Sequence, residues 1–287
     1  MPITSMVDIL ADAKAGGYAV GSFNSLDLTM VRGVIRAAED ESSPVIISHA
    51  EVHFDYTPLD SLIPIFLEEA SKARVPVALL LDHGRSFDPI VRALSSGMNS
   101  VMFDGSELGY EDNISQTKEI VKIAHAMNAT VEGELGRVGR PENASAGGFD
   151  DDSIVDDESL YTDPDQAAEF VARTGVDALA CAFGTAHGIY RKEPKLDFPR
   201  LKAISEKVGV PIVMHGGSGL SAQDFRLAIA NGVTKVNYFT NMSFSAGKLI
   251  KKMTAQTDEP FYHDVIVWAQ QAIYDDVRQV IRLFKGA

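Results

Sequence analysis

Eight short runs rich in apolar and β-branched residues recur along the chain and alternate with stretches of helical periodicity. The runs cover residues 19–24, 44–50, 77–83, 100–105, 130–136, 178–184, 212–217 and 235–240. Between them, polar and apolar positions follow helical spacing, for example over residues 28–38, 62–73, 111–127, 164–174 and 201–208. Strands that alternate with helices imply right-handed crossovers and a parallel sheet, so the pattern predicts an α/β protein.

The number of strand–helix units favours one architecture over its main alternative. Eight units within 287 residues match a closed (β/α)8 TIM barrel better than an open doubly wound sheet. A Rossmann-type sheet would need Gly-x-Gly-x-x-Gly after the first strand, whereas residues 21–24 read Gly-Ser-Phe-Asn. We predict one TIM-barrel domain over residues 1–287. A stretch at about residues 137–162 lacks apolar periodicity and predicts a long mobile loop at the catalytic face.

Composition limits the partners and the compartment. The formal charge of −14 argues against nucleic acid and anionic membranes, which require a basic surface. A small molecule is the expected partner, and an anionic one would be held by backbone N–H groups or helix N-termini. The single cysteine, Cys181, lies in an apolar run and is expected to be buried. Without an internal disulfide, a signal core or a membrane-length apolar run, the chain is expected to be cytoplasmic.

Histidines finish three of the predicted strands. His83, His187 and His215 end strands 3, 6 and 7, and in a TIM barrel these ends meet at the catalytic face. Three imidazoles at one rim leave a tetrahedral zinc ion with one open position, which is the arrangement of a catalytic zinc site. The remaining histidines lack this placement and are left out of the metal site, namely His49, His53, His125 and His263.

Carboxylates accompany these histidines. Asp82 directly precedes His83, so both side chains can reach the rim, and the carboxylate suits proton transfer to a metal-bound substrate. Asp104 and Glu134 end strands 4 and 5. They are candidates either for a second or transient metal position or for acceptors that orient the histidines.

The ends of strands 7 and 8 predict a phosphate site. Gly216, Gly217, Ser218 and Gly219 follow strand 7 and can present successive N–H groups to an oxyanion. Asn237 to Thr240 end strand 8, and these two loops form the recurrent phosphate site of TIM barrels. No lysine ends a strand in the pocket, and Lys235 is expected at the opposite face, which argues against Schiff-base chemistry.

The series of motifs resembles class II fructose-bisphosphate and tagatose-bisphosphate aldolases over nearly the whole chain. The matching stretches are residues 21–24, 81–84, 132–136, 184–188, 215–219 and the Asn and Thr of strand 8. The resemblance implies an aldehyde-lyase of carbohydrate metabolism that splits a ketose 1-phosphate or 1,6-bisphosphate into dihydroxyacetone phosphate and an aldehyde. It also implies Zn²⁺ as cofactor, allows a nearby Na⁺ or K⁺, and implies a homodimer or homotetramer.

The same resemblance assigns roles to residues. It places zinc on His83, His187 and His215, with Asp104 and Glu134 in an alternative metal position, and gives proton transfer at the C4 hydroxyl to Asp82. Glu142, on the predicted loop, would carry the C1 proton. The expected substrate-binding residues are Asn24, Ser48, Gly188, Gly216, Gly217, Ser218, Asn237 and Thr240.

The departures from the family pattern all fall on the aldehyde half of the site. Residues 49–56 replace a small Gly/Ala-rich stretch, residues 237–241 are bulkier than usual, and residues 267–271 offer glutamine where fructose-bisphosphate aldolases carry an arginine for the second phosphate. We therefore expect an acceptor other than glyceraldehyde 3-phosphate, which residues 49–56 or Arg140 could contact. Two alternative functions stay open from sequence, a TIM-barrel metal-dependent hydrolase and a non-catalytic aldolase-like subunit.

Overall fold

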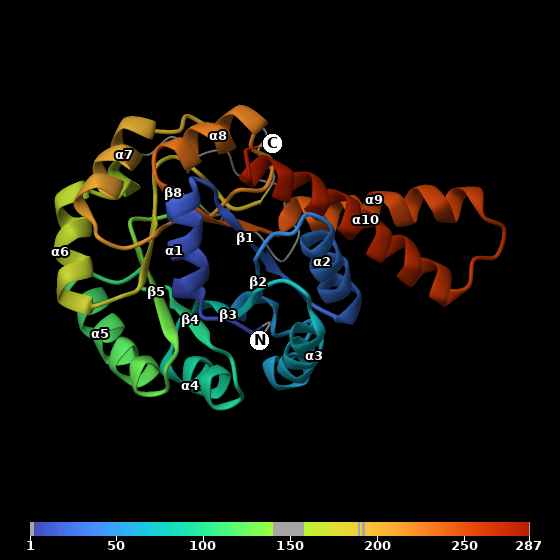
Figure 1. Cartoon of the computed structure of the whole chain (residues 1–287), viewed down its shortest axis with the longest axis horizontal. Coiled ribbons are helices and arrows are strands. Elements are labelled where there is room, and N and C mark those ends of the chain that lie inside the picture. Colours follow the sequence, from blue (N-terminus) through green and yellow to red (C-terminus); the bar gives the residue numbers. More distant parts are fainter. Residues whose placement is uncertain (1–2, 140–157, 189, 191–192, 287) are drawn as a thin grey trace.

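A closed parallel barrel forms the centre of the molecule, as Figure 1 shows. The computed structural model describes residues 3–139, 158–188, 190 and 193–286. Eight strands follow one another around the barrel in chain order, β1 Val20–Asn24, β2 Val45–Ala50, β3 Val77–Gly84, β4 Ser100–Phe103, β5 Thr130–Leu135, β6 Ala178–Cys181, β7 Ile212–Met214 and β8 Val233–Tyr238. The predicted (β/α)8 TIM barrel is confirmed.

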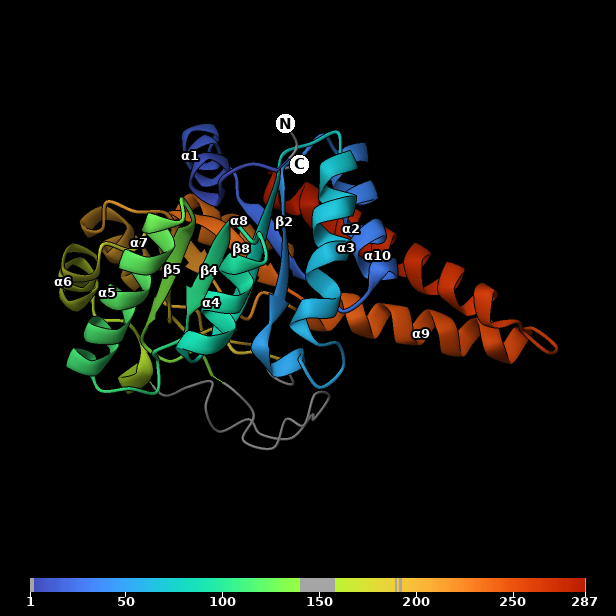
Figure 2. The same cartoon turned by 90° about the horizontal axis from the view of Figure 1, so that it is seen from below.

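Helices cover the outside of the barrel and one of its ends. They are α1 Met6–Gly16, α2 Leu28–Asp40, α3 Leu59–Lys72, α4 Phe87–Ser95, α5 Tyr110–Ala126, α6 Pro164–Thr174, α7 Phe198–Lys207, α8 Ala222–Ala230, α9 Thr240–Gln256 and α10 Tyr262–Phe284, with 3-10 turns η1 Glu51–His53 and η2 Glu158–Leu160. The distal parts of α9 and α10 extend away from the barrel as an antiparallel pair (Figures 1 and 2). Helix α10 also packs along α2.

Two apolar clusters follow from the alternation of side chains along the strands. Outward-facing residues such as Phe23, Leu79 and Val131 pack against the helices. Inward-facing residues at the N-terminal end of the barrel pack against α1, including Val20, Ile46, Leu80, Met102, Ala180, Val213 and, from α1, Met6, Ile9, Leu10 and Ala13. The N-terminal half of the barrel interior is therefore filled with apolar side chains. The polar side chains of the candidate site lie toward the C-terminal ends of the strands.

The strand boundaries differ from the prediction mainly in three neighbouring strands, β6, β7 and β8. Strands β6 and β7 end at Cys181 and Met214, earlier than expected, so His187 and His215 lie on the loops that follow. Strand β8 begins at Val233, two residues before its predicted start, because Val233 pairs with Ile212 of β7. Cys181 is buried as predicted, and burial raises the pKa of its thiol to about 12.

Most of the predicted loop over residues 137–162 lies outside the described residues, which omit 140–157. At its base the Arg137 N–H donates to the Leu160 carbonyl over 2.8 Å, so the two described ends of the segment lie side by side. In the part of the chain that the structure describes, no helix is long and apolar enough to cross a membrane.

Candidate metal centre and active site

Three histidines meet at the C-terminal end of the barrel. His83, His187 and His215 each offer a ring nitrogen, and these atoms all lie within 4.8 Å of one another. The His83 and His215 rings are nearly perpendicular, with His83 Nε2 only 3.0 Å from His215 Nδ1. The His187 ring centroid lies 5.1 Å from that of His83 and 5.8 Å from that of His215. The structure thus brings together the three histidines that the sequence predicts as metal ligands.

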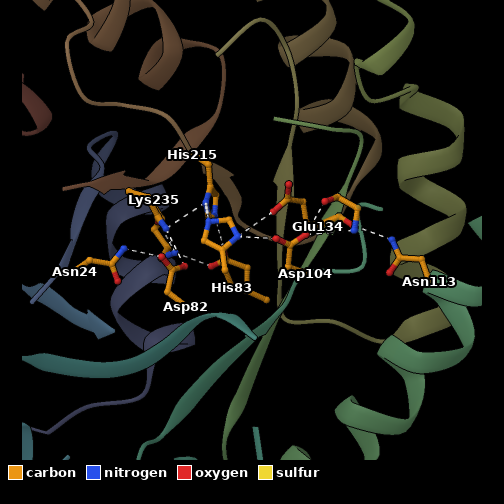
Figure 3. A network of polar contacts seen from close by, with 11 residues as sticks. Asn24, Asp82, His83, Asp104, Asn113, Glu134, His215 and Lys235 are labelled. Atoms are coloured by element: carbon orange, nitrogen blue, oxygen red, sulfur yellow. Dashed lines mark hydrogen bonds and ion pairs between the residues drawn. The ribbon is translucent and has the colours of Figure 1, made fainter. Parts of the chain in front are cut away.

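A local distortion of β3 lets two consecutive residues face the site. In a regular strand Asp82 and His83 would point to opposite sides of the sheet. Pairing between β3 and β4 shifts register between Leu81 and Gly84, and His83 has a φ of 47°, a rare value for a residue other than glycine. The distortion turns the His83 ring toward the barrel mouth while Asp82 stays directed inward (Figure 3).

A buried ion pair supports His215 from below. Its Nε2 lies 2.9 Å from Glu132 Oε1, and because an ionised carboxylate can only accept, Nε2 carries the proton and Nδ1 keeps its lone pair. Glu132 Oε2 accepts from the Lys235 ammonium at 2.7 Å, and both side chains are fully buried. Burial alone raises the pKa of Glu132, but Lys235 and His215 outweigh it and lower that pKa.

The expected position of Lys235 at the opposite face is wrong. Because β8 starts at Val233, Lys235 is its third residue and has the same orientation as Asn237, into the barrel (Figure 3). Its ammonium donates to Asn237 Oδ1 at 2.7 Å as well as to Glu132. Both contacts engage the Lys235 ammonium, which therefore serves as a structural cation on the N-terminal side of the histidines.

Two carboxylates lie on the other side of the His83 ring. Asp104 Oδ2 lies 2.8 Å from His83 Nδ1, and Glu134 Oε2 lies 3.8 Å from the same nitrogen. These three side chains form a second group able to hold a metal ion. His83 thus faces the other histidines with one nitrogen and the carboxylates with the other, which is compatible with both roles expected for Asp104 and Glu134.

Asp82 is buried and held at both oxygens. The Asn24 amide donates to Oδ2 at 2.8 Å and the Asn237 amide donates to Oδ1 at 3.0 Å. Burial by itself raises the pKa of Asp82, but the charges of His83, His215 and Lys235 outweigh it and place that pKa far below its usual range. The carboxylate is therefore ionised and oriented beside the histidines, as a proton acceptor requires.

The same carboxylates act on His83. Burial lowers the pKa of an imidazole, but Asp82, Asp104 and Glu134 favour its charged form and raise the pKa of His83 to about 9. These carboxylates thus favour a positive charge at the ring. Burial also lowers the pKa of His215.

Backbone geometry shapes the glycine-rich loop after β7. Gly216 has a φ of 69°, and a Cβ there would lie 2.5 Å from the Ala186 carbonyl oxygen. Gly217 also passes close to β8, since a Cβ there would lie 3.0 Å from the Asn237 carbonyl oxygen. Ser218 Oγ accepts from the Phe239 N–H at 3.2 Å. The loops after β6, β7 and β8 are thus packed against one another, as the predicted phosphate site requires.

The remaining substrate-binding candidates, Ser48, Gly188 and Thr240, are near this end of the barrel. Ser48 is buried in β2 and its hydroxyl accepts from that of Ser22 at 3.2 Å. Gly188 follows His187 with a φ of 99°, and Thr240 is the first residue of α9. The second catalytic candidate, Glu142, lies outside the described residues.

Residues without an assigned role also shape the site. Glu132 and Lys235 lie two positions before Glu134 and Asn237 in β5 and β8, so the alternation of side chains along each strand is the signal that could have found them. Tyr190 has no such signal. Its hydroxyl accepts from the Ala186 N–H at 2.7 Å and donates to the Gly216 carbonyl at 2.8 Å, which links the loops after β6 and β7.

The residues fit a divalent metal ion. Tetrahedral zinc with Zn–N bonds of about 2.0–2.1 Å places its nitrogen ligands a little over 3 Å apart, close to the 3.0 Å between His83 Nε2 and His215 Nδ1. Glu132 fixes the His215 tautomer in the way carboxylates fix metal-bound histidines. A parallel barrel with such a rim belongs to the metal-dependent TIM-barrel proteins.

Comparison with known proteins narrows this class. The family model described as "Fructose-bisphosphate aldolase class-II" matches residues 4–287. A Bacillus subtilis (strain 168) protein named "Probable fructose-bisphosphate aldolase" is 36% identical over 289 residues, covering 99% of this chain and 98% of that protein. The crystal structure of the YdjI aldolase from Escherichia coli K12 shares 38% identity and a TM-score of 0.86, covering 98% of this chain and 97% of that one.

A more distant structure supports the fold alone. The fructose-bisphosphate aldolase of Campylobacter jejuni is 21% identical with a TM-score of 0.79, covering 98% of this chain and 95% of that one.

The chain belongs to the class II fructose-bisphosphate aldolase family, whose members are metal-dependent lyases. This membership favours an aldolase over the metal-dependent hydrolase that the sequence left open.

Proposed function

We propose that the chain is a zinc-dependent aldolase that reversibly cleaves a ketose 1-phosphate or 1,6-bisphosphate to dihydroxyacetone phosphate and an aldehyde. The observation that carries the proposal is the placement of Asp82. Its carboxylate is buried, ionised and held by Asn24 and Asn237 beside the three histidines. Carbon–carbon cleavage needs a base for the C4 hydroxyl next to a site that stabilises an enediolate, and this arrangement offers both.

The proposed roles follow from this geometry. His83, His187 and His215 would hold zinc, and the bound ion would act as a Lewis acid that offsets the negative charge of the enediolate. Asp82 would take the C4 hydroxyl proton during cleavage and return it during condensation. Glu142 stays our candidate for the C1 proton, and Asp104 and Glu134 stay candidates for an alternative metal position.

The phosphate of the donor half would lie at the loops after β6, β7 and β8. Gly216 and Gly217 allow the backbone to approach an anion closely, and a backbone site avoids the need for a basic side chain in an acidic protein. Gly188, Ser218, Asn237 and Thr240 would complete this half, with Na⁺ or K⁺ as a companion ion. Ser48 and Asn24 would line the opposite side.

Proton exchange tests the proposal directly. An aldolase forms the enediolate from dihydroxyacetone phosphate alone, so it exchanges one C–H hydrogen with deuterated water without any aldehyde. We expect this exchange in the zinc-loaded protein and its loss with a strong chelator. Asp82→Ala should keep the exchange but lose carbon–carbon cleavage. Absence of exchange in the zinc-loaded protein would identify a non-catalytic subunit, and inactivation by borohydride with substrate would instead indicate a Schiff base.

We propose further that the acceptor is not glyceraldehyde 3-phosphate. A second phosphate is bound best by a bidentate arginine, and the α10 segment offers Gln270 and Gln271 where that arginine is expected. Comparing kcat/KM for fructose and tagatose bisphosphates with that for longer ketose 1-phosphates tests the idea. A bisphosphate that reaches about 10⁴ M⁻¹s⁻¹ and is not exceeded would contradict it.

We also propose a homodimer or homotetramer in the cytoplasm. Large apolar side chains are exposed at the tip of the α9–α10 pair, with Phe261 69%, Tyr262 80% and Val267 61% exposed. Exposed apolar patches of this kind often mark subunit contacts. The reduced, buried Cys181 suits a reducing compartment. Sedimentation analysis of the wild type and of Tyr262→Asp tests the assembly.

A further inference from the structure

The segment between β2 and α3 is fixed at the mouth of the barrel. Ala50 of β2 pairs at the level of Asp82 of β3, and η1 follows immediately, so η1 stands just beyond Asp82. Glu51 Oε2 accepts from the Arg85 N–H at 2.8 Å, which ties η1 to the residue after β3. His49 Nε2 donates to the Thr57 carbonyl at 2.9 Å and holds the other end of the segment.

His53, the last residue of η1, is held in an aromatic setting. Its ring centroid lies 4.5 Å from that of Phe239, the residue after β8, and 6.4 Å from that of Tyr56. The side chains therefore bridge the ends of β2 and β8, on the side of the barrel where Asn24 and Asn237 hold Asp82. This is the side opposite to Asp104 and Glu134 in Figure 3.

One nitrogen of the His53 ring makes no hydrogen bond to any of the described residues. His53 is only 7% exposed, yet its Nδ1 is buried without a hydrogen-bond partner there. A buried polar atom left unpaired costs about 1–3 kcal/mol, so such atoms are normally satisfied by a ligand or water. His53 is also close enough to Asp82 and His83 for their charges to act on it. Burial is the largest influence and lowers the pKa of His53 to about 4, so the ring is neutral at neutral pH.

We propose that His53, together with Phe239 and Tyr56, forms the subsite for the aldehyde half of the substrate and selects an uncharged, hydroxylated aldehyde. A neutral imidazole can exchange a hydrogen bond with a sugar hydroxyl, and an aromatic ring can pack against the C–H face of a sugar. None of these three side chains supplies the positive charge that a second phosphate needs. The inference rests on the proposed aldolase function and names the class of its acceptor.

Variants of His53 test the subsite on the zinc-loaded enzyme. His53→Phe keeps a ring to pack on Phe239 but removes both nitrogens, whereas His53→Asn keeps a polar group near the position of Nδ1. His125→Phe is the matched control, because His125 lies in the last turn of α5, away from the proposed site, with 43% of its side chain exposed. The readout is kcat/KM for condensation of dihydroxyacetone phosphate with uncharged three- and four-carbon aldoses and, separately, with glyceraldehyde 3-phosphate.

We expect His53→Phe to lower kcat/KM for the uncharged aldoses about tenfold more than for glyceraldehyde 3-phosphate, equivalent to about 1.4 kcal/mol. His53→Asn should recover part of this selectivity, and the control should match the wild type. Equal losses with both aldehydes, or no loss with the uncharged ones, would overturn the subsite. Hydrogen exchange into dihydroxyacetone phosphate by the wild type separates the two hypotheses, because without it the aldolase function itself fails.

Discussion

Lys235 lies beneath the proposed metal site, and its replacement tests how that site is held together. Its ammonium is fully buried and lies 2.7 Å from both Glu132 Oε2 and Asn237 Oδ1. Lys235→Met fills a similar volume but leaves the Glu132 carboxylate without its cation. Removing one partner of a buried ion pair costs about 3–5 kcal/mol. Methionine regains part of this by apolar burial, so we expect a loss of about 3 kcal/mol in the free energy of unfolding.

The same change should weaken metal binding. Glu132 accepts the Nε2–H of His215, and partners that orient a metal-bound histidine typically contribute 10–100-fold in affinity. Without Lys235, the buried carboxylate would favour protonation and lose its hold on His215. Urea unfolding of the metal-free protein measures the stability, and competition with a chromophoric chelator measures the zinc affinity. A total stability of about 5–15 kcal/mol, usual for a domain, leaves the variant folded.

Two further variants make the reasoning refutable. The double variant Lys235→Met with Glu132→Gln removes both charges and should recover at least about 1 kcal/mol relative to the single variant, since no charge is left buried alone. Lys202→Met, at a lysine 63% exposed on α7, should be nearly neutral. If Lys235→Met costs less than about 1 kcal/mol and leaves zinc affinity within about twofold, the ion pair does not hold His215 in place.

Three further predictions concern the loop, the glycine turn and the metal. Glu142→Ala should slow turnover about 10²-fold at unchanged zinc content if this residue carries the C1 proton, and an unchanged rate would assign the loop another role. Gly216→Ala should lower the free energy of unfolding by at least about 1–2 kcal/mol, because the φ of Gly216 is 69° and the added Cβ would meet the Ala186 carbonyl. Gly209→Ala is the control and should not destabilise the protein, since nothing lies within 4 Å of a Cβ at that position. Urea unfolding measures both. Zinc binding at pH 7 should release about one proton, because the His83 pKa of about 9 means a charged ring in the metal-free protein, whereas zinc requires a neutral ring. The affinity of the protein for zinc should therefore rise with pH up to about 9. Calorimetry in two buffers of different ionisation enthalpy would detect the released proton.

The barrel and the convergence of its histidines could be predicted because both follow from periodic signals. Eight alternating units imply a parallel barrel, and a parallel barrel places all strand ends at one face. His83, His187 and His215 could be assigned to one site on this basis without knowledge of any contact. Their order along the chain did not matter, since the topology alone brings them together.

Two features depended on backbone details that no periodic signal gives. The φ of 47° at His83 turns its ring into the site, although strict alternation would direct it away from Asp82. A two-residue error in the start of β8 was enough to misplace Lys235, because it put this residue at the first position of the strand, at the far end of the barrel, whereas Lys235 is the third residue of β8, two positions before Asn237. The sequence marked His53 only as one of residues 49–56, the stretch expected to contact the acceptor, and its contact with Phe239, 186 positions away, has no periodic signal.

Charge connects the proposed metal to the substrate. Among the residues that the structure describes, four carboxylates are buried at the C-terminal end of the barrel, those of Asp82, Asp104, Glu132 and Glu134. Lys235 compensates Glu132, while the raised pKa of His83 shows that the others favour a positive charge at its ring. An anionic sugar phosphate would be repelled by such a site without a cation. A divalent ion at the histidines would reverse this local potential, so metal binding and substrate binding are expected to be coupled, and removal of the metal should weaken binding of dihydroxyacetone phosphate as well as its chemistry.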